Sequence, residues 1–67
     1  MKLFFEDKFG REREIAEVAN IEEAFVEIKV FLDKYNYKSY YTRHWTEDGV
    51  TTFDVGSHSE FFRLRER

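Results

Sequence analysis

The sequence predicts a small α+β domain, in which one amphipathic helix packs on one face of a small antiparallel sheet. The 67 residues include eight Phe, four Tyr and one Trp, enough aromatic area to build a core in so short a chain. Residues 21–35 have the apolar spacing of an amphipathic helix. Turn signals at Gly10 and Gly49 each join two strand-like segments. We therefore expect one domain over 1–67 with a hairpin–helix–hairpin order, ββαββ, or ββαβββ if the C-terminal segment adds a strand.

The first hairpin begins at the N-terminus. Lys2–Glu6 has strand composition, and Asp7–Gly10 is a turn in which Gly10 supplies a positive φ. Arg11–Val18 is the predicted returning strand. Its apolar alternation is poor, so a short helix over the same residues is the alternative interpretation.

Opposite charges indicate a register for this hairpin. Pairing the two segments around the turn places Glu6 opposite Arg13 and Lys2 opposite Glu17. Cross-strand pairs of opposite charge stabilise an antiparallel sheet, so we expect this register.

The helix is predicted over 21–35. Asn20 is a strong N-cap residue, and Glu23 follows at the capping-box position. Asn36 can take the left-handed conformation that ends a helix. The apolar stripe predicted to be buried consists of Ile21, Ala24, Phe25, Ile28, Leu32 and Tyr35.

Val26 and Val30 lie four residues apart on the opposite side of this helix, among charged residues. Isolated surface valines need no explanation. The alternative is a contact stripe for a second chain, because small domains with little core often self-associate.

The second hairpin is predicted from Lys38–Thr46 and Val50–Val55, joined at Asp48–Gly49. A two-residue loop pairs Trp45 with Thr52, whereas a three-residue loop starting at Glu47 pairs Trp45 with Thr51. We favour the three-residue loop, because it gathers the large apolar side chains on one face. The predicted core side is Tyr41, Trp45, Phe53 and Val55, and the predicted outward side is Tyr40, Thr42, His44, Thr52 and Asp54.

The C-terminal segment 60–65 follows a break at 56–59 and is predicted to be a strand. Ser57 and Glu60 could instead form a capping box for a terminal helix. On a strand, the arginines at 63, 65 and 67 share one face. They would meet an acidic partner, neutralise the glutamates of the helix or keep an edge strand soluble.

Catalytic and metal chemistry have weak signals. The chain has no cysteine and two histidines. His44, Asp54 and His58 are candidate metal ligands, but nothing fixes a coordination geometry and an ordinary surface histidine is the favoured interpretation. Ser57, His58 and Glu60 combine the groups of a hydrolase, although adjacency in sequence does not make a triad. We expect no enzyme activity, no catalytic residues, no metal and no cofactor.

The basic aromatic segment 34–45 is the main candidate for binding. Exposed Tyr, Trp and Arg side chains are enriched at protein contacts. We expect a protein partner, or a second copy in a homodimer. The candidate partner-binding residues are Tyr37, Lys38, Tyr40, Thr42 and His44, together with Val26 and Val30. Single-stranded nucleic acid bound by Lys38, Tyr40 and Arg43 is the alternative, since bases stack on aromatic rings while cations follow the phosphates.

Residues 38–43 and 53–62 resemble small uncharacterised proteins of phages and prophages of Gram-positive bacteria. The resemblance covers mainly the C-terminal half and implies no activity and no site residues. It implies a protein made in the host cytoplasm that binds a host or defence protein. No apolar run approaches the roughly 20 residues of a membrane span, so we expect no membrane contact and a cytoplasmic location.

Overall fold

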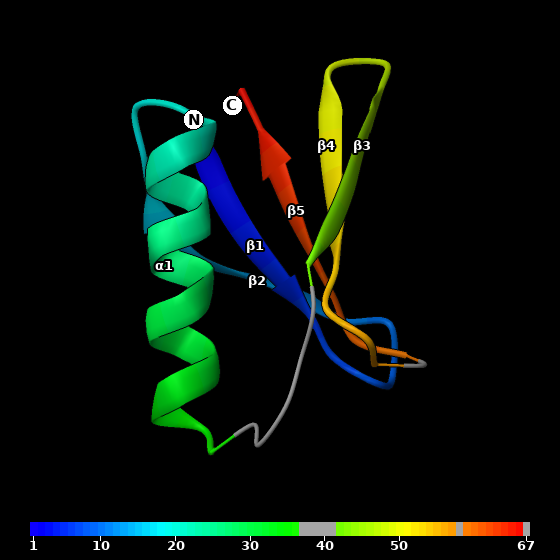
Figure 1. Cartoon of the computed structure of the whole chain (residues 1–67). Helices are drawn as coiled ribbons and strands as arrows, with labels where there is room; N and C mark the ends of the chain where they lie inside the picture. Colours follow the sequence, from blue (N-terminus) through cyan, green and yellow to red (C-terminus); the bar gives the residue numbers. More distant parts are fainter. Residues whose placement is uncertain (37–41, 58, 67) are drawn as a thin grey trace.

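The computed structural model describes residues 1–36, 42–57 and 59–66. Figure 1 shows two layers, a helix lying across one face of an antiparallel sheet. In chain order the elements are β1 (Lys2–Glu6), β2 (Glu12–Glu17), α1 (Ile21–Lys34), β3 (Arg43–Glu47), β4 (Val50–Asp54) and β5 (Phe61–Arg65). The five strands are ordered β2-β1-β5-β4-β3. The predicted α+β fold is confirmed, and the C-terminal segment is a strand that takes the centre of the sheet.

The β1–β2 hairpin turns on Asp7 and Gly10. The Asp7 carboxylate accepts hydrogen bonds from the backbone N–H groups of Phe9 at 2.9 Å and Arg11 at 3.0 Å. Gly10 has a φ of +81°, a conformation that costs glycine little. The returning segment is a strand, which excludes the alternative of a short helix.

The predicted charge pairing of this hairpin is half right. Lys2 lies opposite Glu17, as expected, but Glu6 lies opposite Glu12 and not Arg13. A bulge between the Leu3 and Phe4 pairs leaves one extra residue on β2 and moves the rest of the strand by one position. Two glutamates therefore face each other across β1 and β2.

Helix α1 begins with the predicted cap. The Asn20 carboxamide accepts the Glu23 backbone N–H at 2.9 Å, and the Glu23 carboxylate accepts the Ala19 N–H at 2.9 Å. Asn36, with a φ of +61°, follows the end of the helix in the left-handed conformation. Tyr35 is 49% exposed, so its predicted burial is wrong. It lies at the C-cap, beyond the last helical turn that faces the sheet.

The β3–β4 hairpin corrects the favoured register. Asp48 and Gly49 have φ values of +51° and +76°, and the strand partners are Trp45–Thr52 and Glu47–Val50, so the loop has two residues and not three. Two central residues with positive φ match the natural twist of the flanking strands. His44 is consequently opposite Phe53.

This register reverses the predicted sides of β3. Phe53 is fully buried beneath α1, and Phe25 of α1 packs edge-on against both the Phe53 and the His44 rings, with centroids 5.2 Å apart in each case. His44 therefore lies on the helix side, and Trp45, 44% exposed, lies on the open side with Thr52. The helix supplies Phe53 with an aromatic neighbour, which Trp45 was expected to provide. Tyr40 and Tyr41 lie outside the described residues.

The core occupies the space between α1 and the sheet. Around Phe5, Phe31 and Phe62 the ring centroids are 4.7 to 5.3 Å apart. The buried apolar residues are Leu3, Phe5, Val18, Ala24, Ile28, Leu32, Phe53, Val55, Phe62 and Leu64. No element covers the other side of the sheet in the described parts of the chain, so the structure has a helix face and an open face.

Candidate protein-binding surfaces

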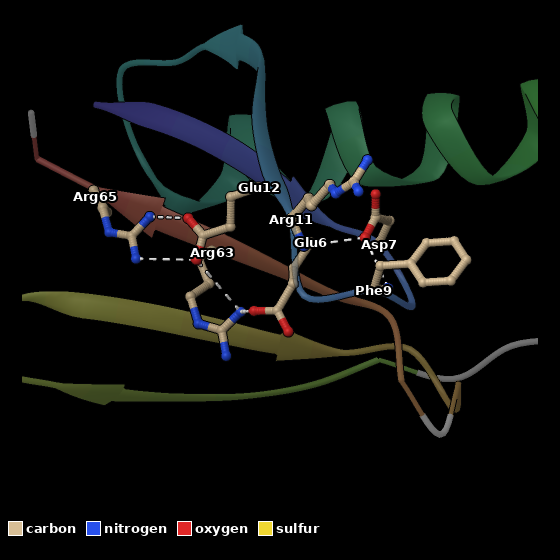
Figure 2. A network of polar contacts seen from close by, with 7 residues as sticks. All are labelled: Glu6, Asp7, Phe9, Arg11, Glu12, Arg63 and Arg65. Carbon is tan, nitrogen blue, oxygen red and sulfur yellow. Dashed lines mark hydrogen bonds and ion pairs between the residues drawn. The ribbon is translucent and has the colours of Figure 1, made fainter.

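The open face carries a partly buried charge network (Figure 2). Arg63 on the central strand contacts Glu6 of β1 and approaches Glu12 of β2, with 3.9 Å between Nη1 and the Glu12 Oε2. Arg65 donates two hydrogen bonds to the Glu12 carboxylate, one of them at 3.2 Å. These hydrogen bonds lower the pKa of Glu12 and raise the pKa of Arg65. The β5 arginines thus bridge the two glutamates that the bulge brings face to face.

This network corrects two interpretations of the C-terminal arginines. They neutralise glutamates of β1 and β2, not those of the helix. Their strand is the central one, so they do not protect an edge. Arg67 lies outside the described residues. Because Arg63 and Arg65 are already paired with carboxylates, phosphate groups of a nucleic acid would have to compete for them.

Asp54 is also tied within the open face. Its carboxylate accepts from Arg43 at 2.6 Å and from the Gly56 backbone N–H at 2.9 Å, and these bonds lower its pKa. His44 lies on the opposite side of the sheet, so the predicted placement of His44 and Asp54 on one face is wrong. His58 lies outside the described residues. Within the described ranges no three His, Asp or Glu side chains gather as metal ligands would.

The remaining predicted site residues are separated. Thr42 is exposed just before β3, and His44 is exposed beside Phe25. Tyr37, Lys38 and Tyr40 lie outside the described residues. Ser57 serves the turn before β5, where its hydroxyl accepts the backbone N–H groups of Ser59 and Glu60 at 3.4 and 3.2 Å.

Val26 and Val30 form the exposed side of α1, at 60% and 55% exposure. Val30 also lines a hollow of about 190 Å³ between the helix and β2. A neighbouring hollow of about 230 Å³ shares Ile15, Phe31 and Lys34 with it. We call Val26, Val30 and these two hollows the α1–β2 surface.

The groove of this surface combines an apolar floor with charged walls. Ile15 and the rings of Phe31 and Tyr35 form the floor, and the two ring centroids are 4.6 Å apart. The Arg13 guanidinium lies 6.0 Å from the Phe31 ring centroid. A third hollow of about 390 Å³ continues the groove from Arg13 towards the β1–β2 turn.

Ile15, Phe31 and Tyr35 were missed as binding candidates from the sequence. Phe31 is not part of the predicted apolar stripe, and Tyr35 was placed inside it. Ile15, the extra residue of the bulge, lines the groove, and no local sequence signal marks the bulge. The helical position of Phe31, next to Val30, is a signal for the α1 wall of the groove but not for its β2 wall.

Strand β3 is the second exposed surface. It is an edge strand of the sheet, next to β4, and all five of its residues are exposed. Trp45 is the largest of them and was predicted to be core. Figure 1 shows this hairpin on the opposite side of the view from α1, with its tip well apart from the helix.

Among the described residues, no helix combines the length and the apolar composition needed to cross a membrane. No family model, curated protein or solved structure matches the chain. The function is therefore inferred from the two surfaces just described.

Proposed function

We propose that the protein is a non-enzymatic binding module that holds a protein partner against the α1–β2 surface. The observation that carries this proposal is a pair of exposed valines four residues apart on α1, Val26 and Val30, of which Val30 lines a groove together with Ile15 and Phe31. Exposed apolar side chains that lead into a hollow are typical of protein contacts.

The choice of valine at these two helix positions supports the proposal. Valine is a weaker helix former than alanine by about 0.5 kcal/mol, because its branched side chain loses rotamer freedom in a helix. Val26 and Val30 are mostly exposed, so burial within this chain does little to offset that cost. A partner that covers them supplies the missing burial.

The chemistry of the groove defines the partner. Its floor takes one or two apolar or aromatic anchors, and its walls carry both charge signs through Arg13, Lys34, Glu14 and Glu27. We propose a partner segment with apolar anchors flanked by charged residues. The resemblance to phage and prophage proteins would make the partner a host or defence protein met in the cytoplasm.

The test removes the two exposed valines and leaves the fold intact. We expect the double variant Val26→Asp/Val30→Asp to lose at least about tenfold in affinity for proteins captured from a bacterial lysate by the wild type, since buried unpaired charges are costly. The matched control is Phe9→Ser, which removes a 74% exposed ring that is not part of the α1–β2 surface, and it should capture the same proteins. Equal capture by the double variant would refute the proposal. Salt-sensitive binding to a single-stranded oligonucleotide would favour a nucleic-acid function instead.

A further inference from the structure

We propose that the outer edge of β3 pairs with the same edge of a second copy of this chain, forming a symmetric antiparallel dimer with one continuous sheet. β3 is at the end of the strand order, and its outer side pairs with no other strand in the described parts of the chain. A regular open edge presents unpaired backbone donors and acceptors, which are a template for another strand.

The hairpin register fixes which backbone groups point outward. In a two-residue hairpin the pair that flanks the turn is hydrogen-bonded, and bonded and non-bonded pairs alternate from there. Glu47 pairs with Val50 next to the turn, so Glu47, Trp45 and Arg43 bond to β4. The N–H and C=O groups of His44 and Thr46 therefore point away from the sheet.

This pattern selects a register for the dimer. An antiparallel neighbour must place outward groups opposite outward groups. With the two-fold axis at Trp45, His44 of each copy lies opposite Thr46 of the other, and each of these two pairs exchanges two backbone hydrogen bonds. The axis at Trp45 is the one that uses the full length of β3 in both copies.

Charge complementarity favours the same register. It places Arg43 of each copy opposite Glu47 of the other, so the strand has a cation at one end and an anion at the other. The Arg43 side chain is 66% exposed, so Glu47 of the second copy can approach its guanidinium while the hydrogen bond to Asp54 stays in place. Shifting the axis to His44 or Thr46 loses both of these ion pairs.

The side chains at the axis also suit a dimer. Trp45 faces Trp45 of the second copy in a non-bonded pair, where strands approach most closely and side chains touch. Trp45 is 44% exposed in the single chain, so the contact removes apolar area from water. Because five residues make a small interface, we expect a dissociation constant in the micromolar range.

The dimer goes beyond the proposed function and has a consequence for it. The two-fold axis at the β3 edge is perpendicular to the sheet, so both α1 helices lie on the same side of the continuous sheet. Two α1–β2 surfaces would then be displayed together, which increases the apparent affinity for a partner with repeated sites.

Sedimentation equilibrium tests the dimer on the full chain. Between about 10 µM and about 1 mM we expect wild type to pass from monomer towards twice the chain mass. Thr46→Pro removes an outward N–H and should stay monomeric, while Val26→Asp/Val30→Asp should dimerise as wild type does. A wild type that stays monomeric throughout this range, or a Thr46→Pro variant that dimerises equally well, would overturn the proposal.

A crosslinking test does not depend on the proline variant folding. The chain has no cysteine, so Trp45→Cys introduces a single thiol, and oxidation should give a disulfide-linked dimer. Val26→Cys, exposed on the helix, is the control and should crosslink slowly. Crosslinking that is faster through position 26 than through position 45 would place the interface on α1 and contradict pairing at β3. The α1–β2 proposal is tested separately by the capture experiment, and it fails if Val26→Asp/Val30→Asp captures the same proteins as wild type.

Discussion

The two edge strands of the sheet meet solvent in different ways. β2 is interrupted by a bulge, and its Arg13 points to the helix side, over the rings of Phe5 and Phe31. Its open-face residues are Glu12, Glu14 and Glu17. Bulges and inward-pointing charges are means by which proteins prevent edge-to-edge pairing. β3 pairs regularly with β4 over all five of its residues and presents Trp45 and Thr46.

This contrast between β2 and β3 indicates which edge of the sheet can add a strand. β2 is protected along the side where the α1–β2 groove lies, so a partner there binds through side chains rather than by strand addition. β3 is regularly paired and exposed, so its edge is suited to backbone pairing. The two proposed contacts would therefore use opposite edges of the sheet.

Proline substitution at neighbouring positions of β3 is expected to give the largest effect. Trp45→Pro removes an N–H bonded to β4 and should cost about 3 kcal/mol or more of unfolding free energy. Thr46→Pro removes an outward N–H and the hydroxyl pair with Thr51, which are 2.8 Å apart, and should cost about 1 kcal/mol. Urea denaturation at low micromolar protein measures both. Equal losses of stability would show that the assignment of the Trp45 N–H to β4 and of the Thr46 N–H to the outer edge is wrong.

Loss of Arg63 is the next largest change and addresses β2. Arg63→Met leaves Glu6 opposite Glu12 without the bridging cation, so we expect a loss of about 1–2 kcal/mol. The matched variant Arg43→Met removes a more exposed ion pair and should cost less than about 1 kcal/mol. Amide hydrogen exchange should accelerate in β2 for the first variant and in β3 for the second. Exchange that rises throughout the sheet in both would mean that neither edge is held locally.

Much of the fold was predictable because its signals are local. Asn20 and Glu23 cap the helix where the sequence predicted, and Gly10 turns the first hairpin. The two errors of register have non-local causes. With the bulge in β2, the adjacent residues Ile15 and Ala16 both pack against the core, and in the β3 register Phe25 of α1 lies beside Phe53, where Trp45 was expected.

The candidate surfaces were predictable only in part. Val26 and Val30 are exposed as the helical period indicated. His44 and Trp45 exchanged sides, because a shift of register by one residue turns every side chain of a strand to the other face. The groove needed both the bulge and the helix position, so neither segment alone indicated it.

The two turn glycines allow a comparison of the hairpins at a smaller scale. Both Gly10 and Gly49 have positive φ, and a Cβ at either would meet nothing within 4 Å. Gly10→Ala and Gly49→Ala should therefore each cost about 1 kcal/mol through backbone strain alone. Thermal unfolding followed by circular dichroism measures this. A cost at Gly49 well above that at Gly10 would indicate that the β3–β4 turn is held by contacts beyond its backbone conformation.

Loss of stability in acid is the smallest expected effect. Its dependence on salt concentration distinguishes the carboxylate at the β2 edge from the one beside β3. The pKa of Glu12 is lowered by its hydrogen bond from Arg65, and the pKa of Asp54 by its hydrogen bond from Arg43. A carboxyl group whose pKa is lower in the folded than in the unfolded state makes stability rise with pH. Each contribution is complete above the unfolded values of 4.5 and 3.8 and is lost as the pH falls through them towards the folded pKa.

We expect Glu12→Gln and Asp54→Asn each to flatten this acid limb by about 1 kcal/mol or less, measured by urea unfolding between pH 2 and pH 6. Added salt should weaken the two ion pairs unequally. The Arg43 side chain, which pairs with Asp54, is 66% exposed, whereas Glu12 and Arg65 are joined by two hydrogen bonds. At high salt the difference between wild type and Asp54→Asn should shrink more than that between wild type and Glu12→Gln. The opposite order would mean that the Arg43–Asp54 ion pair at β3 is the better shielded from salt. It would contradict the contrast between a β2 edge held by its ion pairs and an exposed β3 edge.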